Sequence, residues 1–205
     1  MKVFTILLFI FFWPSLFAAE LHHMAEEGEL KQLQSLIASG AKLNERDADN
    51  LTPMHVAAYN EHPNIIKALI RAGADVNLKM KNGRTALHLA AFYADTKSVS
   101  FLLRANAQVN VKGHLGMTPL HRAAEGGGVK VLQMLIAAGA DVNAQSKDLS
   151  TPLYIAAYMG NLKAAKLLLL EGADINAKDN EGKTPLDAAK EAGEQEMVEL
   201  LSKAK

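Results

Sequence analysis

The sequence predicts an all-α solenoid, in which short helical hairpins stack on one another behind a separate apolar N-terminal segment. Two sets of sequence markers recur with a step of 33 residues from about residue 20 to the C-terminus. Between the markers, alanine and leucine positions recur at helical spacing. Hydrophobic residues make up 49% of the chain, which excludes a disordered protein. A unit of this length cannot bury its apolar face alone, so neighbouring units must stack.

The first marker is a threonine that is followed in most copies by proline, an apolar residue and histidine. It recurs without a slip as Thr52-Pro53-Met54-His55, Thr85-Ala86-Leu87-His88, Thr118-Pro119-Leu120-His121, Thr151-Pro152-Leu153-Tyr154 and Thr184-Pro185-Leu186-Asp187. Threonine is a good helix N-cap, and proline suits the first helical position because no amide partner is lost there. Each copy therefore predicts the start of a helix.

Two helices are predicted in each unit. The first carries alanine pairs such as Ala57-Ala58, Ala90-Ala91, Ala123-Ala124 and Ala156-Ala157, which form helix readily and let neighbouring helices approach closely. The second carries a leucine at one position of the period: Leu36, Leu69, Leu102, Leu135, Leu168 and Leu201. The glycine that follows this helix fits a left-handed C-cap, and asparagine, which replaces it at Asn106, also visits that region.

The second marker is an asparagine at the same step, at Asn44, Asn77, Asn110, Asn143 and Asn176, mostly preceded by a Gly-Ala-Asp sequence. The two markers in register resemble the ankyrin-repeat family over about residues 20 to 205. The resemblance implies about six helix-turn-helix units with short β-hairpin fingers, starting near residues 19, 52, 85, 118, 151 and 184. Polar residues at Lys190 and Ser202 indicate a capping unit at the C-terminal end. Leu149 replaces a turn glycine, so we expect the finger over residues 144–150 to differ in shape.

Residues 1–19 are predicted to be a signal peptide. Lys2 precedes an apolar run over residues 3–13, and small residues follow at Ala18 and Ala19. The run is shorter than the roughly 20 residues of a membrane-spanning helix. An uncleaved membrane anchor and a buried helix remain the alternatives. The domain over residues 20–205 is thus expected to be exported, into the periplasm if the source is a bacterium, or secreted. It has no cysteine, so packing alone must stabilise it.

No cofactor, metal site or catalytic machinery is expected. His22, His55, His88 and His121 recur once per unit. Packed helices lie about 8–10 Å apart, and zinc–nitrogen bonds measure about 2 Å, so one ion cannot bridge equivalent histidines. We expect a hydrogen-bonding role for them instead. The run over residues 126–128 is three glycines, which we interpret as a connecting turn because it lacks the order of a phosphate-binding loop. An enzyme remains a distant alternative.

A candidate binding surface follows the alanine pairs. In ankyrin repeats the two residues after that pair usually face the concave side and often contact partners. In this chain they are Tyr59-Asn60, Phe92-Tyr93, Glu125-Gly126 and Tyr158-Met159. Aromatic residues are enriched at binding hot spots, so we predict that these side chains anchor a partner protein. The alternative is that they only shield the alanine-rich helices from water.

Two central fingers are basic. One carries Lys79, Lys81 and Arg84, the next carries Lys112 and His114, and neither holds an acidic residue. We expect them to steer an acidic partner towards the groove, the alternative being an ordinary solvated surface. Because the formal net charge is zero, the chain lacks the basic footprint of nucleic-acid binding. We predict a monomeric, non-enzymatic protein–protein interaction module that acts as a scaffold, inhibitor or protective factor; a membrane-tethered adaptor is the alternative.

Overall fold

The computed structural model describes the backbone of residues 13–204 and the side chains from Ala19 onwards. This part of the chain contains α-helices, one short 3-10 helix and no β-strand. The α-helices are α1 (Trp13–Glu27), α2 (Leu30–Ala38), α3 (Pro53–Tyr59), α4 (Pro63–Arg71), α5 (Ala86–Phe92), α6 (Thr96–Arg104), α7 (Pro119–Gly126), α8 (Val129–Ala137), α9 (Pro152–Tyr158), α10 (Leu162–Leu170), α11 (Pro185–Ala192) and α12 (Gln195–Lys203), and the 3-10 helix is η1 (His114–Gly116).

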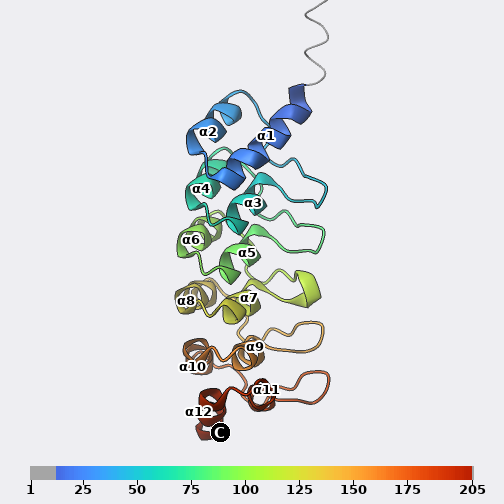
Figure 1. The fold of residues 1–205 in the computed structure, drawn as a ribbon. Coiled ribbons are helices and arrows are strands. Elements are labelled where there is room, and N and C mark those ends of the chain that lie inside the picture. Colours follow the sequence, from blue (N-terminus) through green and yellow to red (C-terminus); the bar gives the residue numbers. More distant parts are fainter. Residues whose placement is uncertain (1–12, 205) are drawn as a thin grey trace, which may run out of the picture.

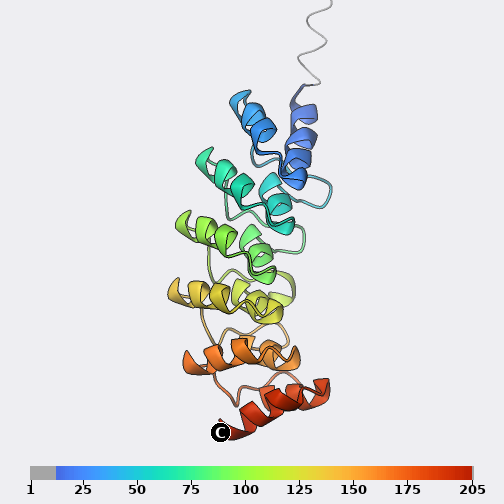
Figure 2. The same ribbon diagram turned by 60° about the vertical axis from the view of Figure 1, so that its left-hand side comes forward.

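The helices form two rows that run the length of an elongated stack (Figure 1). Each odd-numbered helix packs on the even-numbered helix that follows it and on the odd-numbered helices above and below. The even-numbered helices make the second row, which Figure 2 brings forward. Long loops project from the side of the odd row that faces away from the second row. The predicted all-α repeat solenoid is therefore confirmed.

None of the helices in this part of the chain is both long enough and apolar enough to pass through a membrane.

From α3 onward, each odd-numbered helix begins where a threonine predicts. Thr52, Thr85, Thr118 and Thr184 each form a capping box, in which the threonine side chain accepts a bond from the backbone three residues later and the side chain there bonds back. Thr151 accepts a hydrogen bond from the backbone amide of Tyr154. These caps satisfy helix-end amides that would otherwise lack a partner, which fixes where each unit starts.

The core is continuous along the stack and lies between the two rows. The alanine pairs of α3, α5, α7 and α9 are fully buried, which lets successive odd-numbered helices approach closely. The predicted leucine column of the even-numbered helices is also buried, with 8% of Leu36 exposed and none of the other members. At about 25 cal/mol per Å² of apolar surface, this burial is the main force that stabilises the stack.

A ladder of asparagines joins consecutive units. The side-chain oxygens of Asn44, Asn77, Asn110 and Asn143 accept hydrogen bonds, at 2.8–3.0 Å, from backbone amides in the next unit. The side-chain amides of the last three donate to carbonyls two residues beyond the end of the next even-numbered helix. The second sequence marker therefore links units, in addition to marking where each one turns.

The projecting loops close with one shared turn and form no strand in the described residues, so the expected β-hairpin pairing is not confirmed. In the second loop the Met80 amide donates to the Arg84 carbonyl, and the Gly83 amide donates to the Met80 carbonyl. The loop over residues 144–150 repeats both bonds, with Leu149 at a φ of 62° in the glycine position. Our expectation of a different shape there was wrong, because the turn bonds hold Leu149 in the left-handed region.

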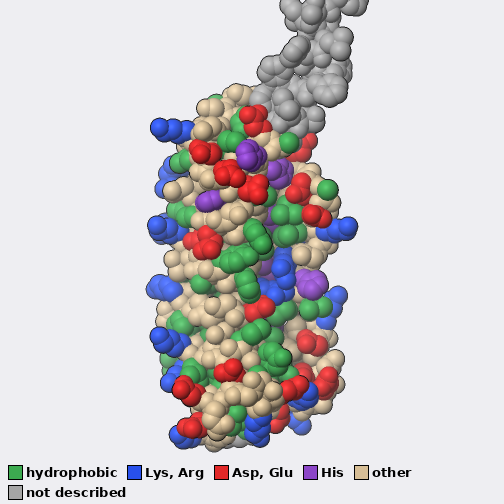
Figure 3. All heavy atoms as spheres, in the orientation of Figure 1, with side chains coloured by type: hydrophobic (Ala, Val, Ile, Leu, Met, Phe, Trp, Pro, Cys, Tyr) green, Lys and Arg blue, Asp and Glu red, His purple; other side chains and the backbone are tan. Residues whose placement is uncertain are grey.

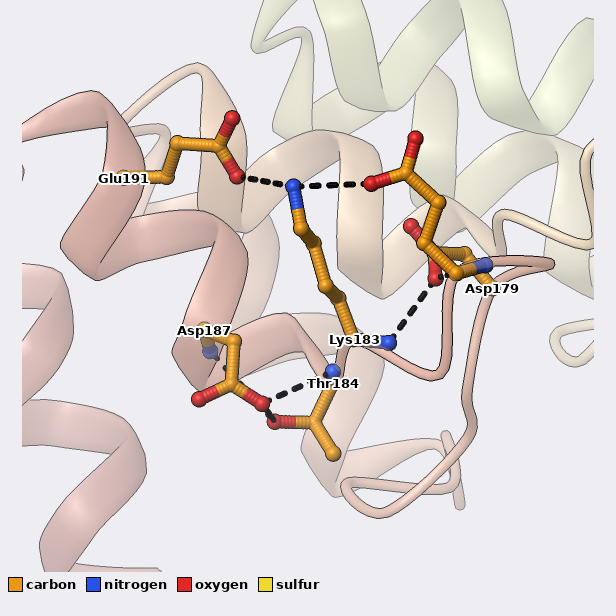
Figure 4. A network of polar contacts seen from close by, with 6 residues as sticks. Asp179, Lys183, Thr184, Asp187 and Glu191 are labelled. Atoms are coloured by element: carbon orange, nitrogen blue, oxygen red, sulfur yellow. Dashed lines mark hydrogen bonds and ion pairs between the residues drawn. The ribbon is translucent and has the colours of Figure 1, made fainter.

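The C-terminal end of the stack differs from its middle. In the last unit Asp187 takes the place of histidine in the capping box, and Lys183 pairs with Glu191 at 2.7 Å and with Glu181 at 3.0 Å (Figure 4). Lys190 and Ser202 are exposed, as expected of a capping unit. At the other end, residues 1–12 of the predicted signal peptide lie outside the described residues.

Candidate protein-binding groove

Three aromatic rings from two neighbouring units form an aromatic cluster, which we define as Tyr59, Phe92 and Tyr93. Tyr93 lies between the other two, with ring centroids 5.6 Å from Tyr59 and 5.1 Å from Phe92 and with both pairs edge-to-face. Tyr59 is 57% exposed and Phe92 37% exposed, whereas Tyr93 is half-buried. Figure 3 shows hydrophobic side chains gathered along the middle of this face of the stack.

The other residues predicted for the groove are placed less uniformly. Tyr158, the last residue of α9, and Met159, its C-cap, are exposed beyond the α7 unit that holds Glu125. Asn60 uses its side-chain amide to bond the Val56 carbonyl of its own helix, at 3.0 Å. The structure thus brings the aromatic cluster together and leaves Tyr158 and Met159 as a second exposed site along the same row.

A small pocket of about 140 Å³ lies beside the aromatic cluster, between α5 and α7. We call it the arginine pocket, because its walls include Arg84 and Arg122 together with Glu125 and the three rings. Arg84 is the last residue before the cap of α5, and Arg122 lies in the first half of α7. Basic atoms are visible between the hydrophobic side chains at this level in Figure 3.

The pocket holds two arginines and one carboxylate, which is ion-paired with Arg122. Arg122 is only 7% exposed, and its Nη1 donates to Glu125 Oε2 at 2.6 Å. The Nε atoms of Arg84 and Arg122 are both buried and have no hydrogen-bond partner. Burial and the neighbouring Arg122 lower the pKa of Arg84, while Glu125 opposes that shift. The pocket therefore holds two positive groups and one negative group in a partly dehydrated site.

Comparison with protein families agrees with this architecture. A family profile of ankyrin repeats in three copies matches residues 21–113 and 120–205, which together are most of the chain. The protein belongs to the ankyrin-repeat family. A comparison with curated proteins gives no match. Ankyrin-repeat domains are generally non-enzymatic modules that bind other proteins, so the groove is the surface in which to look for function.

Three recurring histidines of this ankyrin-repeat protein have a structural role. In His55, His88 and His121 the Nδ1 atom accepts a hydrogen bond from the backbone amide of the capping threonine, at 3.1 Å. The Nε2 atom therefore carries the proton and donates to a loop carbonyl, at 2.9 to 3.1 Å. Burial lowers the pKa of each ring to about 4. The predicted hydrogen-bonding role is confirmed, and these rings are neutral at pH 7.

One group of side chains has the spacing of metal ligands. His23, Glu26 and Glu27 place ligand atoms within 4.8 Å of one another, and all three are exposed. Residues three and four apart on an exposed helix face are neighbours by geometry alone, so this grouping does not indicate a metal.

The basic loops contribute a charged edge beside the groove. Lys79, Lys81 and Lys112 are exposed, and Lys112 Nζ donates to the Gln145 carbonyl of the next loop at 2.8 Å. Arg84, which we grouped with this edge, instead contributes its side chain to the arginine pocket. That change moves one positive charge from the loop tip into the groove.

Arg122 was not predicted to belong to the site. In register with it stand Val56, Leu89 and Ile155, so a single arginine interrupts an apolar column of the first helices. That interruption was readable from the aligned repeats, and a charged residue in a buried column signals either an ion pair or a function. Here it signals the ion pair with Glu125, three residues later.

Proposed function

We propose that this chain is an exported, monomeric binding module of six ankyrin repeats that holds a partner protein against its groove. The observation that carries the proposal is the exposed aromatic cluster beside the arginine pocket. A water-exposed group of three rings has a cost in free energy that a bound partner would remove. Scaffolding, inhibition and protection of the partner are the roles that such a surface serves without catalysis.

Several features favour binding over mere shielding of the alanine helices. The alanine pairs beneath the rings are already fully buried, and half-buried Tyr93 alone fills the space between Tyr59 and Phe92. Tyr59 nevertheless keeps 57% of its surface exposed, which shields little. Lys79, Lys81 and Lys112 lie on the adjacent loops, where they can speed the approach of an acidic partner.

Replacing Tyr59, Phe92, Tyr93 and Tyr158 by alanine is expected to weaken partner binding by about 100-fold or more, since two or three hot-spot residues suffice for such a loss. The measurement is partner recovery after crosslinking and pull-down from the native cell. The control is Leu170→Ala, which removes a side chain that is 82% exposed on the second row of helices. Undiminished recovery with a folded groove variant contradicts the proposal.

Export predicts a mature chain that begins near Ala19 or Glu20. Leu21 and Ala25, which are fully buried, lie beyond this junction, so α1 keeps its core contacts after cleavage. Mass spectrometry of the protein purified from its native cell measures the N-terminus. An intact N-terminus in the membrane fraction would instead support the alternative of a membrane-tethered adaptor.

A further inference from the structure

We propose that the arginine pocket binds the carboxylate of an aspartate or glutamate side chain presented by the partner protein. The inference rests on the proposed function, because it takes the carboxylate from a bound polypeptide. It adds a polar anchor of defined chemistry to a surface that otherwise offers aromatic contacts.

The charges of the pocket are unbalanced in favour of an anion. Two guanidinium groups face one carboxylate, that of Glu125. His88, which also lines the pocket, is neutral and uses both ring nitrogens on Thr85 and Met117. One positive charge thus remains without a counter-charge in a site where aromatic rings limit access of water. An incoming carboxylate balances it.

The unused hydrogen-bond donors fit a carboxylate in particular. Arg122 uses its Nη1 on Glu125, and its buried Nε has no hydrogen-bond partner. Arg84 also leaves its Nε unpaired. A guanidinium edge presents two parallel N–H groups, which match the two oxygens of a carboxylate. Buried donors without a partner are rare in folded proteins, so an unpaired Nε on a residue as buried as Arg122 indicates a missing acceptor.

The size and rim of the pocket favour a side chain over a free metabolite. Its volume of about 140 Å³ lies below the roughly 300–1,000 Å³ of small-molecule sites. The rim is formed by Tyr59, Phe92 and Tyr93, against which the residues that flank an acidic side chain can pack. A free phosphate would gain nothing from this apolar rim, whereas a polypeptide gains both the ion pair and the aromatic contacts.

Nuclear magnetic resonance of the arginine Nε–H groups tests the inference on the whole domain at pH 6.5. The probe is acetyl-Leu-Glu-Leu-amide, and the matched control is the same peptide with glutamine. We expect the Arg84 and Arg122 signals to shift saturably with the glutamate peptide, with an affinity about tenfold above that of the glutamine peptide. The chain's other three arginines, Arg46, Arg71 and Arg104, are exposed and report non-specific association in the same spectrum.

Equal affinity for the two peptides overturns the inference. Inorganic phosphate as a third probe overturns it too if phosphate moves the same two signals with an affinity equal to that of the glutamate peptide, because the site is then one for free anions.

A variant pair completes the test. Arg84→Gln is expected to lower the affinity for the glutamate peptide about tenfold at the Arg122 signal, and Arg104→Gln, at the exposed end of α6, is expected to leave it unchanged. If alanine substitutions in the aromatic cluster abolish partner recovery while the peptides leave both arginines unaffected, this inference alone fails. If the glutamate peptide binds while those substitutions leave partner recovery intact, the proposed function fails instead.

Discussion

Acidification from pH 7 to pH 5 is expected to lower the free energy of unfolding by about 2 kcal/mol for each of the buried histidines His55, His88 and His121. Burial lowers the pKa of each ring to about 4 in the folded protein, against 6.5 for an exposed histidine. Between these values the unfolded chain binds a proton that the folded chain does not. The contribution of these rings to the free energy of unfolding is therefore fully present above about pH 6.5, and it is lost as the pH drops towards 4.

The hydrogen bonds explain why the folded protein resists protonation. A second ring proton would have to sit on Nδ1, which already faces the backbone N–H of the capping threonine. Three such sites together amount to about 6 kcal/mol at pH 5. Since the total stability of a domain is about 5–15 kcal/mol, we expect the stack to unfold near that pH.

Urea unfolding at pH 7 and at pH 5 measures the effect. In His88→Gln, glutamine can form the capping box without titrating, so the difference in free energy between the two pH values should shrink by about 2 kcal/mol. His23→Gln, at an exposed position of α1, is the control and should leave the difference unchanged. A pH difference equal to wild type in His88→Gln would show that this ring is not held neutral in the fold.

Most of the fold was predictable because each unit contacts only its neighbours. Once the threonines fix the register, the 33-residue step places every alanine pair against the next pair. It also places the leucines of the second helices in one buried column. That the described loops form no strands was not predictable from this logic. Each loop closes on itself with a single turn, so no ladder forms in the described residues, and the links between units run through asparagine side chains.

The candidate site was predictable only in part. Tyr59 and Phe92 share one position of the period and Tyr93 occupies the next, so the register alone brought the three rings to one surface. The arginine pocket was not predicted, because it depends on the direction in which individual side chains point. Arg84 belongs to a loop by sequence, yet its side chain reaches the groove. Arg122 stands in an apolar column, where its charge is tolerated only through Glu125.

Gly126→Ala is expected to destabilise the stack by about 3 kcal/mol, although alanine is the better helix former. A β-carbon at Gly126 would lie 2.0 Å from the Phe92 carbonyl oxygen, so α5 and α7 would have to move apart. Overpacking of this kind costs about 1–3 kcal/mol or more. Asn60, Tyr93 and Met159 carry side chains at the equivalent positions, so the close approach is particular to this pair of units.

The sign of the effect distinguishes packing from helix propensity. Without the contact, replacing glycine by alanine inside a helix would stabilise the protein by about 1 kcal/mol. The matched control is Gly139→Ala, where no atom lies within 4 Å of the added carbon and only the positive φ of 88° opposes the change. Its expected cost is about 1 kcal/mol.

Because α5 and α7 enclose the arginine pocket, Gly126→Ala should also weaken binding of the glutamate peptide, and Gly139→Ala should not. A stabilised Gly126→Ala variant would mean that the two helices lie further apart than described, and the pocket between them would be too wide for one carboxylate to reach both arginines.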